Sequence, residues 1–309
     1  MRRIQYTFEW AAFALARKAL GLLPRRVAVA FGAVWGEMAY RLGLRRQVVL
    51  ANLRQAFPEW TVGERRRVAR RVYHNAWRGL VESMLFQTLS PERMNRLIEG
   101  VEGMSYAEQV LAEHKSLIVV TGHLGNWELM GAYFARQGYR LKVFAKPLHN
   151  PKMEADLLAA RRAVGLDVIY TGEGLKPALR HLREGGNLGF VADQDARRAG
   201  IPVPFFGAPA STALGPAVFA YLARVPILPV FAVRAGTGRH RFIICEPIKA
   251  VVAGEKREAA LERMTRAHVA ALEETIRKHP DQYFWFHRRW KTSVEKMARV
   301  QIDNLNLET

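Results

Sequence analysis

Three histidines in this chain are each followed, five positions later, by a glutamate. Such a pair can do acid–base chemistry, because a carboxylate that holds one imidazole nitrogen leaves the other free to accept a proton. The pairs are His123/Glu128, His149/Glu154 and His268/Glu273. Residues five apart on a regular helix point about 140° away from each other, since one turn takes 3.6 residues. The structural context predicted for each pair therefore decides whether its two side chains can meet.

Two of the pairs have ordinary structural explanations. His268 and Glu273 lie inside a predicted helix and are expected on a solvated face. His149 and Glu154 span an Asn-Pro step at 150–151, which is typical of a helix start, where a first-turn glutamate is favourable. We predict no catalytic role for either pair.

The pair His123/Glu128 lies where a predicted strand is followed by a helix. Asn126, between them, is a good N-cap residue, so a helix beginning there places Glu128 in its first turn, beside the turn that contains His123. We expect Glu128 to orient the imidazole and His123 to act as a general base. The alternative is a capped turn with an incidental histidine.

A second polar cluster, Asp193-Gln194-Asp195, follows another predicted strand. Two acidic side chains one residue apart could hold a divalent metal ion, as in some sugar-nucleotide enzymes. They could equally form ion pairs with Arg197 and Arg198. No histidine or third carboxylate is close in sequence, so we predict no metal.

Basic residues follow the predicted strand at 141–144 and the helix start at 150–151. Lys146, Arg161 and Arg162 could clamp a phosphorylated substrate, because guanidinium groups bind phosphate bidentately and lysine supplies a point charge. A solvated helix face explains the same residues, and both interpretations remain open.

The elements that position these residues follow from hydrophobic periodicity. Up to about Glu113 the pattern is helical, and from Ser116 short β-branched runs alternate with helical segments. The predicted strands are residues 117–121, 141–144, 168–170, 188–192, 227–231 and 242–245. This alternation predicts an α/β fold with a mostly parallel or mixed central sheet flanked by helices, and a site at the carboxyl ends of the strands. A long helix is expected over 256–278.

The N-terminal 23 residues contain an apolar stretch of membrane-spanning length. The stretch includes Gln5, Glu9, Arg17 and Lys18, and a charge at the bilayer centre costs roughly 2.5–3.5 kcal/mol. An interfacial helix is therefore favoured over a spanning one, with a second apolar stretch at 27–40 able to reach the same interface.

The composition limits the partners. Half of the 309 residues are hydrophobic, which allows a large core, and the formal net charge is +19. That charge favours anionic lipid, nucleic acid or an acidic carrier protein. Cys245 is the single cysteine, so no intrachain disulfide can form.

Several ordered motifs resemble the bacterial lipid A biosynthesis lauroyl/myristoyl acyltransferases. They are NLRQAFP at 52–58, HLGNWE at 123–128, NP at 150–151 with Arg161 beyond it, DQ at 193–194, FFG at 205–207 and PDQYFWFHRRWK at 280–291. The likeness covers about residues 25–295.

The resemblance implies a lysophospholipid-acyltransferase-like fold on the cytoplasmic face of a bacterial inner membrane. It implies an acyl carrier protein thioester as donor, an anionic lipid such as a lipid A precursor as acceptor, no metal and no organic cofactor. His123 matches the general base and Glu128 the residue that orients it. Lys146, Arg161, Asp193 and Gln194 are predicted to bind substrate. The expected organisation is a membrane-associated helix at 1–23, an acyltransferase domain at 24–295 and a tail at 296–309.

Direct transfer agrees with the residues themselves. An alcohol that attacks a thioester needs a base, and no Gly-x-Ser-x-Gly motif suggests a serine-bound intermediate. Three alternatives remain: acylation of phosphatidylinositol mannoside or ornithine lipid, a metal-dependent glycosyltransferase using Asp193 and Asp195, and a non-catalytic binder. Nucleic acid is not expected, because the aromatic residues are scattered and not interleaved with the basic ones.

Overall fold

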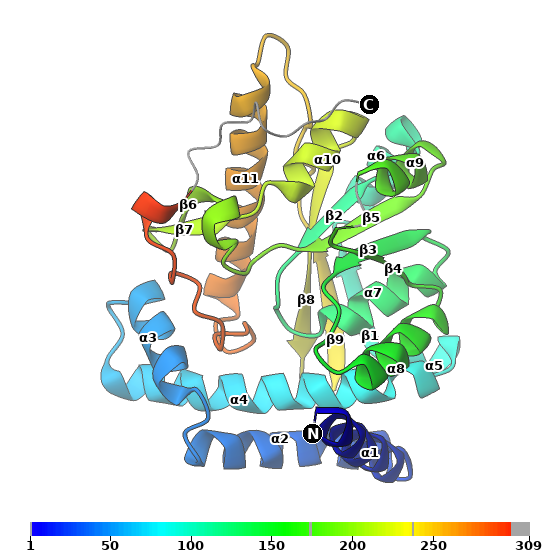
Figure 1. Cartoon of the computed structure of the whole chain (residues 1–309), viewed down its shortest axis with the longest axis vertical. Helices are drawn as coiled ribbons and strands as arrows, with labels where there is room; N and C mark the ends of the chain where they lie inside the picture. Colours follow the sequence, from blue (N-terminus) through cyan, green and yellow to red (C-terminus); the bar gives the residue numbers. More distant parts are fainter. Residues whose placement is uncertain (1, 173–174, 237, 298–309) are drawn as a thin grey trace.

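The computed structural model describes residues 2–172, 175–236 and 238–297. Within that part of the chain, a seven-stranded sheet has the order β1-β9-β8-β2-β5-β3-β4 (Figure 1). Neighbouring strands are parallel except β8 and β9, so the sheet is mixed. The strands are β1 Ile98–Glu102, β2 Ile118–Thr121, β3 Leu141–Ala145, β4 Asp167–Tyr170, β5 Asn187–Val191, β8 Ile227–Ala235 and β9 Arg239–Ile244. The predicted α/β sheet is confirmed.

A separate antiparallel hairpin of β6 Ile201–Phe205 and β7 Ala208–Thr212 lies beside the sheet. Its two-residue turn is Phe206-Gly207, and both residues have positive φ, 48° and 73°. Such a turn matches the twist of paired strands, which explains the glycine of the FFG motif. Neither hairpin strand nor β1 was among the predicted strands.

Helices cover both faces of the sheet. Alternate residues of β2 point to opposite sides: Ile118 and Val120 pack with α10 and α11, while Val119 joins α6 and α7. The helices that follow β1 are α6 Met104–His114, α7 Trp127–Arg136, α8 Pro151–Arg162, α9 Lys176–Arg183, α10 Gly215–Ala223 and α11 Arg257–Lys278. The long helix predicted at 256–278 is confirmed as α11. Short helical turns are η1 Phe86–Thr88, α5 Pro91–Asn95, η2 Arg197–Ala199 and η3 Val294–Lys296.

Four N-terminal helices form a layer across one end of the sheet (Figure 1). They are α1 Arg2–Gly21, α2 Arg25–Arg41, α3 Arg46–Ala56 and α4 Val62–Leu85. Helix α4 begins with a capping box between Thr61 and Glu64, which satisfies backbone donors at its first turn. Helix α2 packs directly on α4, because a Cβ at Gly36 or Gly32 would lie 2.5 or 2.8 Å from an α4 carbonyl oxygen.

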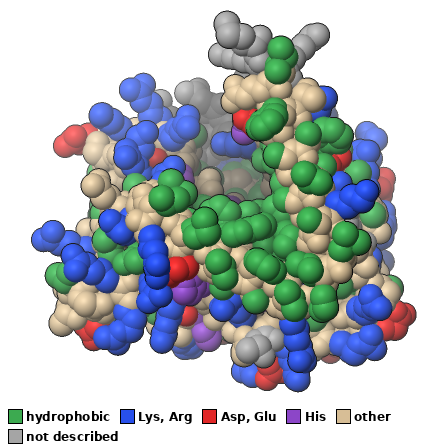
Figure 2. Space-filling view, turned by 90° about the horizontal axis from the view of Figure 1, so that it is seen from below, with side chains coloured by type: hydrophobic (Ala, Val, Ile, Leu, Met, Phe, Trp, Pro, Cys, Tyr) green, Lys and Arg blue, Asp and Glu red, His purple; other side chains and the backbone are tan. Residues whose placement is uncertain are grey.

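The outer side of this layer exposes many apolar side chains (Figure 2). We call it the apolar face, and its exposed members are Ile4, Phe8, Leu15, Leu22, Val27, Phe31, Val34, Met38 and Leu42. Among the described residues, no helix combines the length and the apolar character needed to cross a membrane. Most of the predicted tail, residues 298–309, lies outside the described residues.

Candidate active site

His123 lies just beyond the carboxyl end of β2, in the middle of the sheet. In the parallel pairing of β2 with β5, Thr121 is opposite Val191, so the residues two positions further on, His123 and Asp193, leave the sheet side by side. The imidazole Nδ1 is 2.6 Å from Asp193 Oδ1, and the His123 backbone N–H donates to Oδ2 at 2.9 Å. Two contacts to one carboxylate fix both the ring and the turn.

The charge of Asp193 determines the protonation of this pair. Burial alone disfavours the carboxylate, yet the charge and hydrogen bonds of His123 lower the pKa of Asp193 to about 2. Burial likewise opposes a charged His123, but Asp193 raises the pKa of the imidazole above its ordinary value, with a smaller contribution from Glu128. An ionised carboxylate at Nδ1 places the neutral ring's proton there, which leaves Nε2 as the basic nitrogen.

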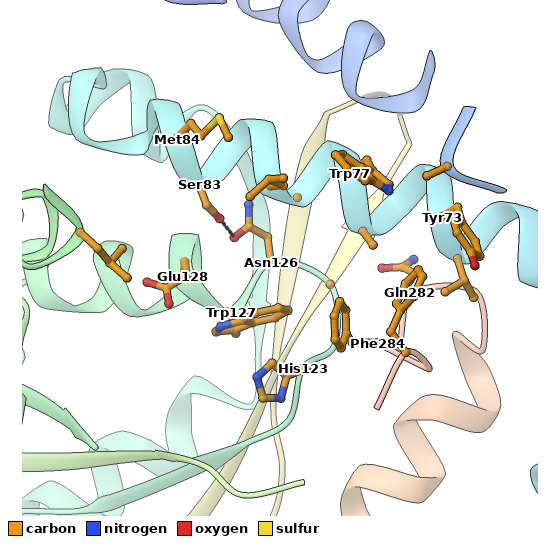
Figure 3. A pocket seen from close by; sticks show the side chains of 18 of the residues that line it. Tyr73, Trp77, Ser83, Met84, His123, Asn126, Trp127, Glu128, Gln282 and Phe284 are labelled. Carbon is orange, nitrogen blue, oxygen red and sulfur yellow. Dashed lines mark hydrogen bonds between the residues drawn. The ribbon is translucent and has the colours of Figure 1, made fainter. Parts of the chain in front are cut away.

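Glu128 does not hold the imidazole, so the expectation that it would was wrong. Its carboxylate binds Arg161 instead, with the guanidinium Nε and Nη2 donating at 3.1 and 2.5 Å. Helix α7 begins at Trp127, and the indole lies between the His123 ring and the Glu128 carboxylate (Figure 3). The Trp127 and His123 rings meet edge to face at 4.6 Å. The first helical turn therefore directs Glu128 away from the histidine.

The turn between His123 and α7 is held by buried polar contacts. Asn126 caps α7 as predicted, accepting from the Leu129 N–H, and its amide donates to Glu82 of α4 at 3.0 Å. Glu82 is buried and also binds both terminal nitrogens of Arg234, at 2.8 and 2.7 Å. Gly125 has φ 58°, and a Cβ there would lie 2.2 Å from the Ala232 carbonyl oxygen, so only glycine fits.

A cavity of about 680 Å³ opens onto His123. One wall is α4 from Val72 to Met84, which at 1.5 Å per residue is a length of roughly 18 Å. The cavity extends along α4 to both sides of the His123 ring (Figure 3). Its apolar lining includes Phe13, Tyr73, Trp77, Leu80, Met84, Leu148, Met153, Leu157, Phe284 and Phe286. A cavity of this length and lining has room for a long hydrocarbon chain beside His123.

Comparison with known proteins decides the family. The model of the bacterial lipid A biosynthesis acyltransferases matches residues 1–292. The chain belongs to this family. It is similar to the lipid A biosynthesis lauroyltransferase of Escherichia coli K12, with 27% identity over 88% of each chain. The palmitoleoyltransferase of the same organism is 26% identical over 87% of each chain. The phosphatidylinositol mannoside acyltransferase of Mycobacterium tuberculosis H37Rv is 22% identical over 74% of this chain and 71% of its own. The protein is therefore an acyltransferase.

The other residues predicted for substrate binding in this acyltransferase are dispersed. Gln194 is exposed, with its amide nitrogen 3.5 Å from His123 Nε2. Arg161 is buried and paired with Glu128, whereas Arg162 and Lys146 are exposed. Neither these three residues nor Gln194 is among those that line the cavity. Asp193 faces the histidine. Only Gln194 thus places a polar group beside the basic nitrogen.

The two aspartates that could have held a metal are each engaged elsewhere. Asp195 accepts from the Thr292 hydroxyl at 2.8 Å and from the Arg197 backbone N–H at 3.2 Å. Asp193 binds His123. In residues 2–172, 175–236 and 238–297, no cluster of three or more histidine, cysteine or acidic side chains could bind a metal ion.

Neither of the remaining His/Glu pairs is among the residues that line the cavity. His149 is exposed, and its partner on the surface is Glu9, at 3.6 Å. His268, expected on a solvated face, is buried, and burial lowers its pKa to about 4. That expectation was wrong because α11 packs against both the sheet and the β6–β7 hairpin, so a wider stripe of the helix is covered. Glu273 accepts the Phe206 backbone N–H at 2.5 Å and does not contact His268.

Proposed function

We propose that this acyltransferase moves a fatty acyl group from an acyl carrier protein thioester to a hydroxyl of a glycolipid such as a lipid A precursor. The observation that carries the proposal is the His123–Asp193 pair, whose histidine lines an apolar cavity in a member of this family. A second acceptor class, phosphatidylinositol mannoside, is favoured by the mycobacterial relative.

His123 Nε2 takes the proton of the acceptor hydroxyl as its oxygen attacks the thioester carbonyl carbon. The imidazolium is stabilised by Asp193, which remains ionised. The tetrahedral intermediate then collapses, the C–S bond breaks, and the imidazolium returns its proton to the leaving thiolate. The Gln194 amide, 3.5 Å from Nε2, is positioned to donate to the carbonyl oxygen as its negative charge develops.

Glu128 has a different role in this proposal from the one expected from its spacing. Its carboxylate lines the cavity while Arg161 holds it from behind. We assign it to positioning the acceptor's hydroxyl or amide groups at the polar part of an otherwise apolar wall. The Glu128→Gln substitution should therefore raise the KM for the acceptor by a larger factor than it lowers kcat.

The apolar face suits the cytoplasmic surface of an inner membrane, where both acceptor and product reside. Its exposed leucine, valine and aromatic side chains lie on α1 and α2 or directly after them, and both helices contact α4, which forms one wall of the cavity. An enzyme lying on this face could exchange lipid with the bilayer without spanning it. The net charge of +19 would favour both anionic lipid and an acidic carrier protein.

The decisive experiment measures acyl transfer by mass spectrometry with acyl carrier protein thioester and a lipid A precursor in mixed micelles. His123→Ala should lower turnover by about 10²- to 10⁴-fold. His149→Ala is the matched control, because that side chain is 74% exposed and outside the cavity. A folded His123→Ala protein that acylates at the wild-type rate would refute the mechanism. Exchange of the lipid A precursor for phosphatidylinositol mannoside tests the second acceptor.

A further inference from the structure

The segment 282–292, near the end of the described chain, runs alongside the catalytic turn. The Gly125 N–H donates to the Gln282 carbonyl at 3.0 Å, and the Phe284 N–H donates to the His123 carbonyl at 2.9 Å. Leu124 and Tyr283 form an isolated antiparallel bridge between these contacts. The main chain at His123 is therefore paired with a segment about 160 residues away in sequence.

The same segment also contacts the loop that contains Asp193. His287 Nε2 accepts the Asp195 backbone N–H at 2.9 Å. The buried Tyr283 hydroxyl interacts with Asp193, and the buried Arg289 adds a positive charge near that carboxylate. One short segment thus touches both loops whose side chains form the catalytic pair.

The segment is itself firmly anchored. The Asn52 amide donates to the carbonyls of Trp285 and His287, each at 2.7 Å. Trp285 is buried, and the Arg289 guanidinium donates to the Ser211 carbonyl at 2.5 Å in the β6–β7 hairpin. Because the segment is fixed to α3 and to the hairpin, it can hold the two loops that it contacts in fixed positions.

We propose that residues 282–292 form a clamp that sets the distance between His123 and Asp193, with His287 as a positioning residue for acyl transfer. This inference rests on the proposed function of the pair. His123 and Asp193 lie on loops after two separate strands, so their 2.6 Å contact needs both loops to be held. The clamp holds the first through main-chain hydrogen bonds and the second through His287.

The imidazole of His287 acts here only as a hydrogen-bond acceptor, so it must be neutral at Nε2. Burial lowers the pKa of His287, which keeps the ring neutral. Glutamine can place its side-chain oxygen near the same point and accept the Asp195 N–H, whereas leucine fills similar space without an acceptor. The pair His287→Gln and His287→Leu therefore isolates this one hydrogen bond.

The experiment measures kcat, both KM values and the pH profile of kcat for the two full-length variants. His287→Leu should lower kcat by about 10- to 100-fold with little change in either KM, since a small displacement of a catalytic group has effects of this size. His287→Gln should stay within a few-fold of wild type. The acidic limb of the profile should move to lower pH in His287→Leu alone, because His123 loses part of its contact with Asp193.

The groups facing the titrating ring are Asp193 and Glu128, with His287, Tyr283 and Arg289 around Asp193. His287→Gln replaces one neutral side chain with another, so at neutral pH it changes no charge around the pair. A folded His287→Leu enzyme with wild-type kcat and an unshifted limb would overturn the clamp, as would an equal defect in both variants.

A second comparison applies if His287→Leu does not fold. Thr292→Val removes the hydroxyl that donates to Asp195 at 2.8 Å, and Thr292→Ser restores it. A lower kcat in the valine variant with recovery in the serine variant supports the clamp, and equal rates contradict it. His123→Ala, measured in parallel, separates this outcome from failure of the proposed function: an active His123→Ala refutes the mechanism, whatever the clamp variants do.

Discussion

The titration of the His123 imidazole should determine how turnover varies with pH. Its pKa is raised by Asp193 against the effect of burial, so the neutral, basic form is lost as pH falls through this raised value. Activity should decline on the acidic side for that reason. Asp193→Asn removes the charge that raises the pKa, so the acidic limb should move to lower pH.

The same substitution should also reduce kcat by about 10²- to 10⁴-fold, because an amide can hold the wrong tautomer and cannot stabilise the imidazolium. Steady-state rates across the pH range, with thermal melting to confirm folding, check both effects. If the acidic limb moves to higher pH or stays in place, Asp193 is not the group that raises the pKa of His123.

His268 gives a prediction about stability and not about catalysis. Its folded pKa of about 4 lies below the ordinary value of 6.5, so the buried ring is neutral in the fold. As pH falls below about 6.5, the ring takes up a proton in the unfolded chain but stays neutral in the fold. The free energy of unfolding therefore has its full contribution from this ring above about pH 6.5 and loses it as pH falls towards about 4. In His268→Leu, the melting temperature should therefore drop less between about pH 7 and about pH 5 than in wild type, while kcat at neutral pH stays within a few-fold.

At the scale of elements, the apolar face can be tested without removing a helix. Deleting α1 would also remove Phe13 and Arg17 from the cavity wall, so point substitutions are cleaner. Phe8→Glu and Met38→Glu, at side chains 76% and 54% exposed, should weaken co-sedimentation with anionic vesicles. Val251→Glu is the matched control, because Val251 is 47% exposed. It belongs to the segment between β9 and α11, which lies at the opposite end of the molecule from α1 and α2 (Figure 1). Equal binding by all variants would place the membrane contact elsewhere.

The elements that were predicted correctly are those with strong periodicity. Strands β2, β3, β4, β5, β8 and β9 are apolar β-branched or aromatic runs, and α11 has a clear buried stripe. Strand β1 was missed because it is an edge strand, IEGVE, with charges and a glycine. The hairpin was missed because Pro202, Pro204 and Pro209 argue against strands in a sheet interior, whereas this hairpin stands alone.

The partner of His123 could not be read from spacing, because it depends on which strands are neighbours. His123 and Asp193 each come within two residues of the end of a predicted strand, a signal present in the sequence. That signal becomes specific only when β2 is known to pair with β5 in parallel. Spacing along the chain favoured Glu128, and the helix that begins at Trp127 turned that side chain towards Arg161.

For the whole molecule, the charge of +19 bears on encounters with the donor. Salt screens charges over about 8–10 Å near physiological ionic strength, so the KM for an acidic acyl carrier protein should rise several-fold with added salt. Acyl-coenzyme A, a smaller donor of the same thioester class, serves as the control and should show a weaker salt dependence. Initial rates across a series of salt concentrations measure both KM values. A KM for the carrier protein that does not change with salt would contradict electrostatic recruitment.

The glycine contact between α2 and α4 has a consequence for the choice of acyl chain. Tyr73 and Trp77, whose carbonyl oxygens meet Gly36 and Gly32, also line the cavity through their side chains. A methyl group at Gly36 must push against the backbone of α4, and that displacement narrows the space on its other side. We expect Gly36→Ala to shift the product towards shorter acyl chains in mass spectra, although the substituted residue never touches lipid in the cavity. The preference for acyl-chain length in this family could then change during evolution through substitutions in the contact between α2 and α4, which neither substrate touches.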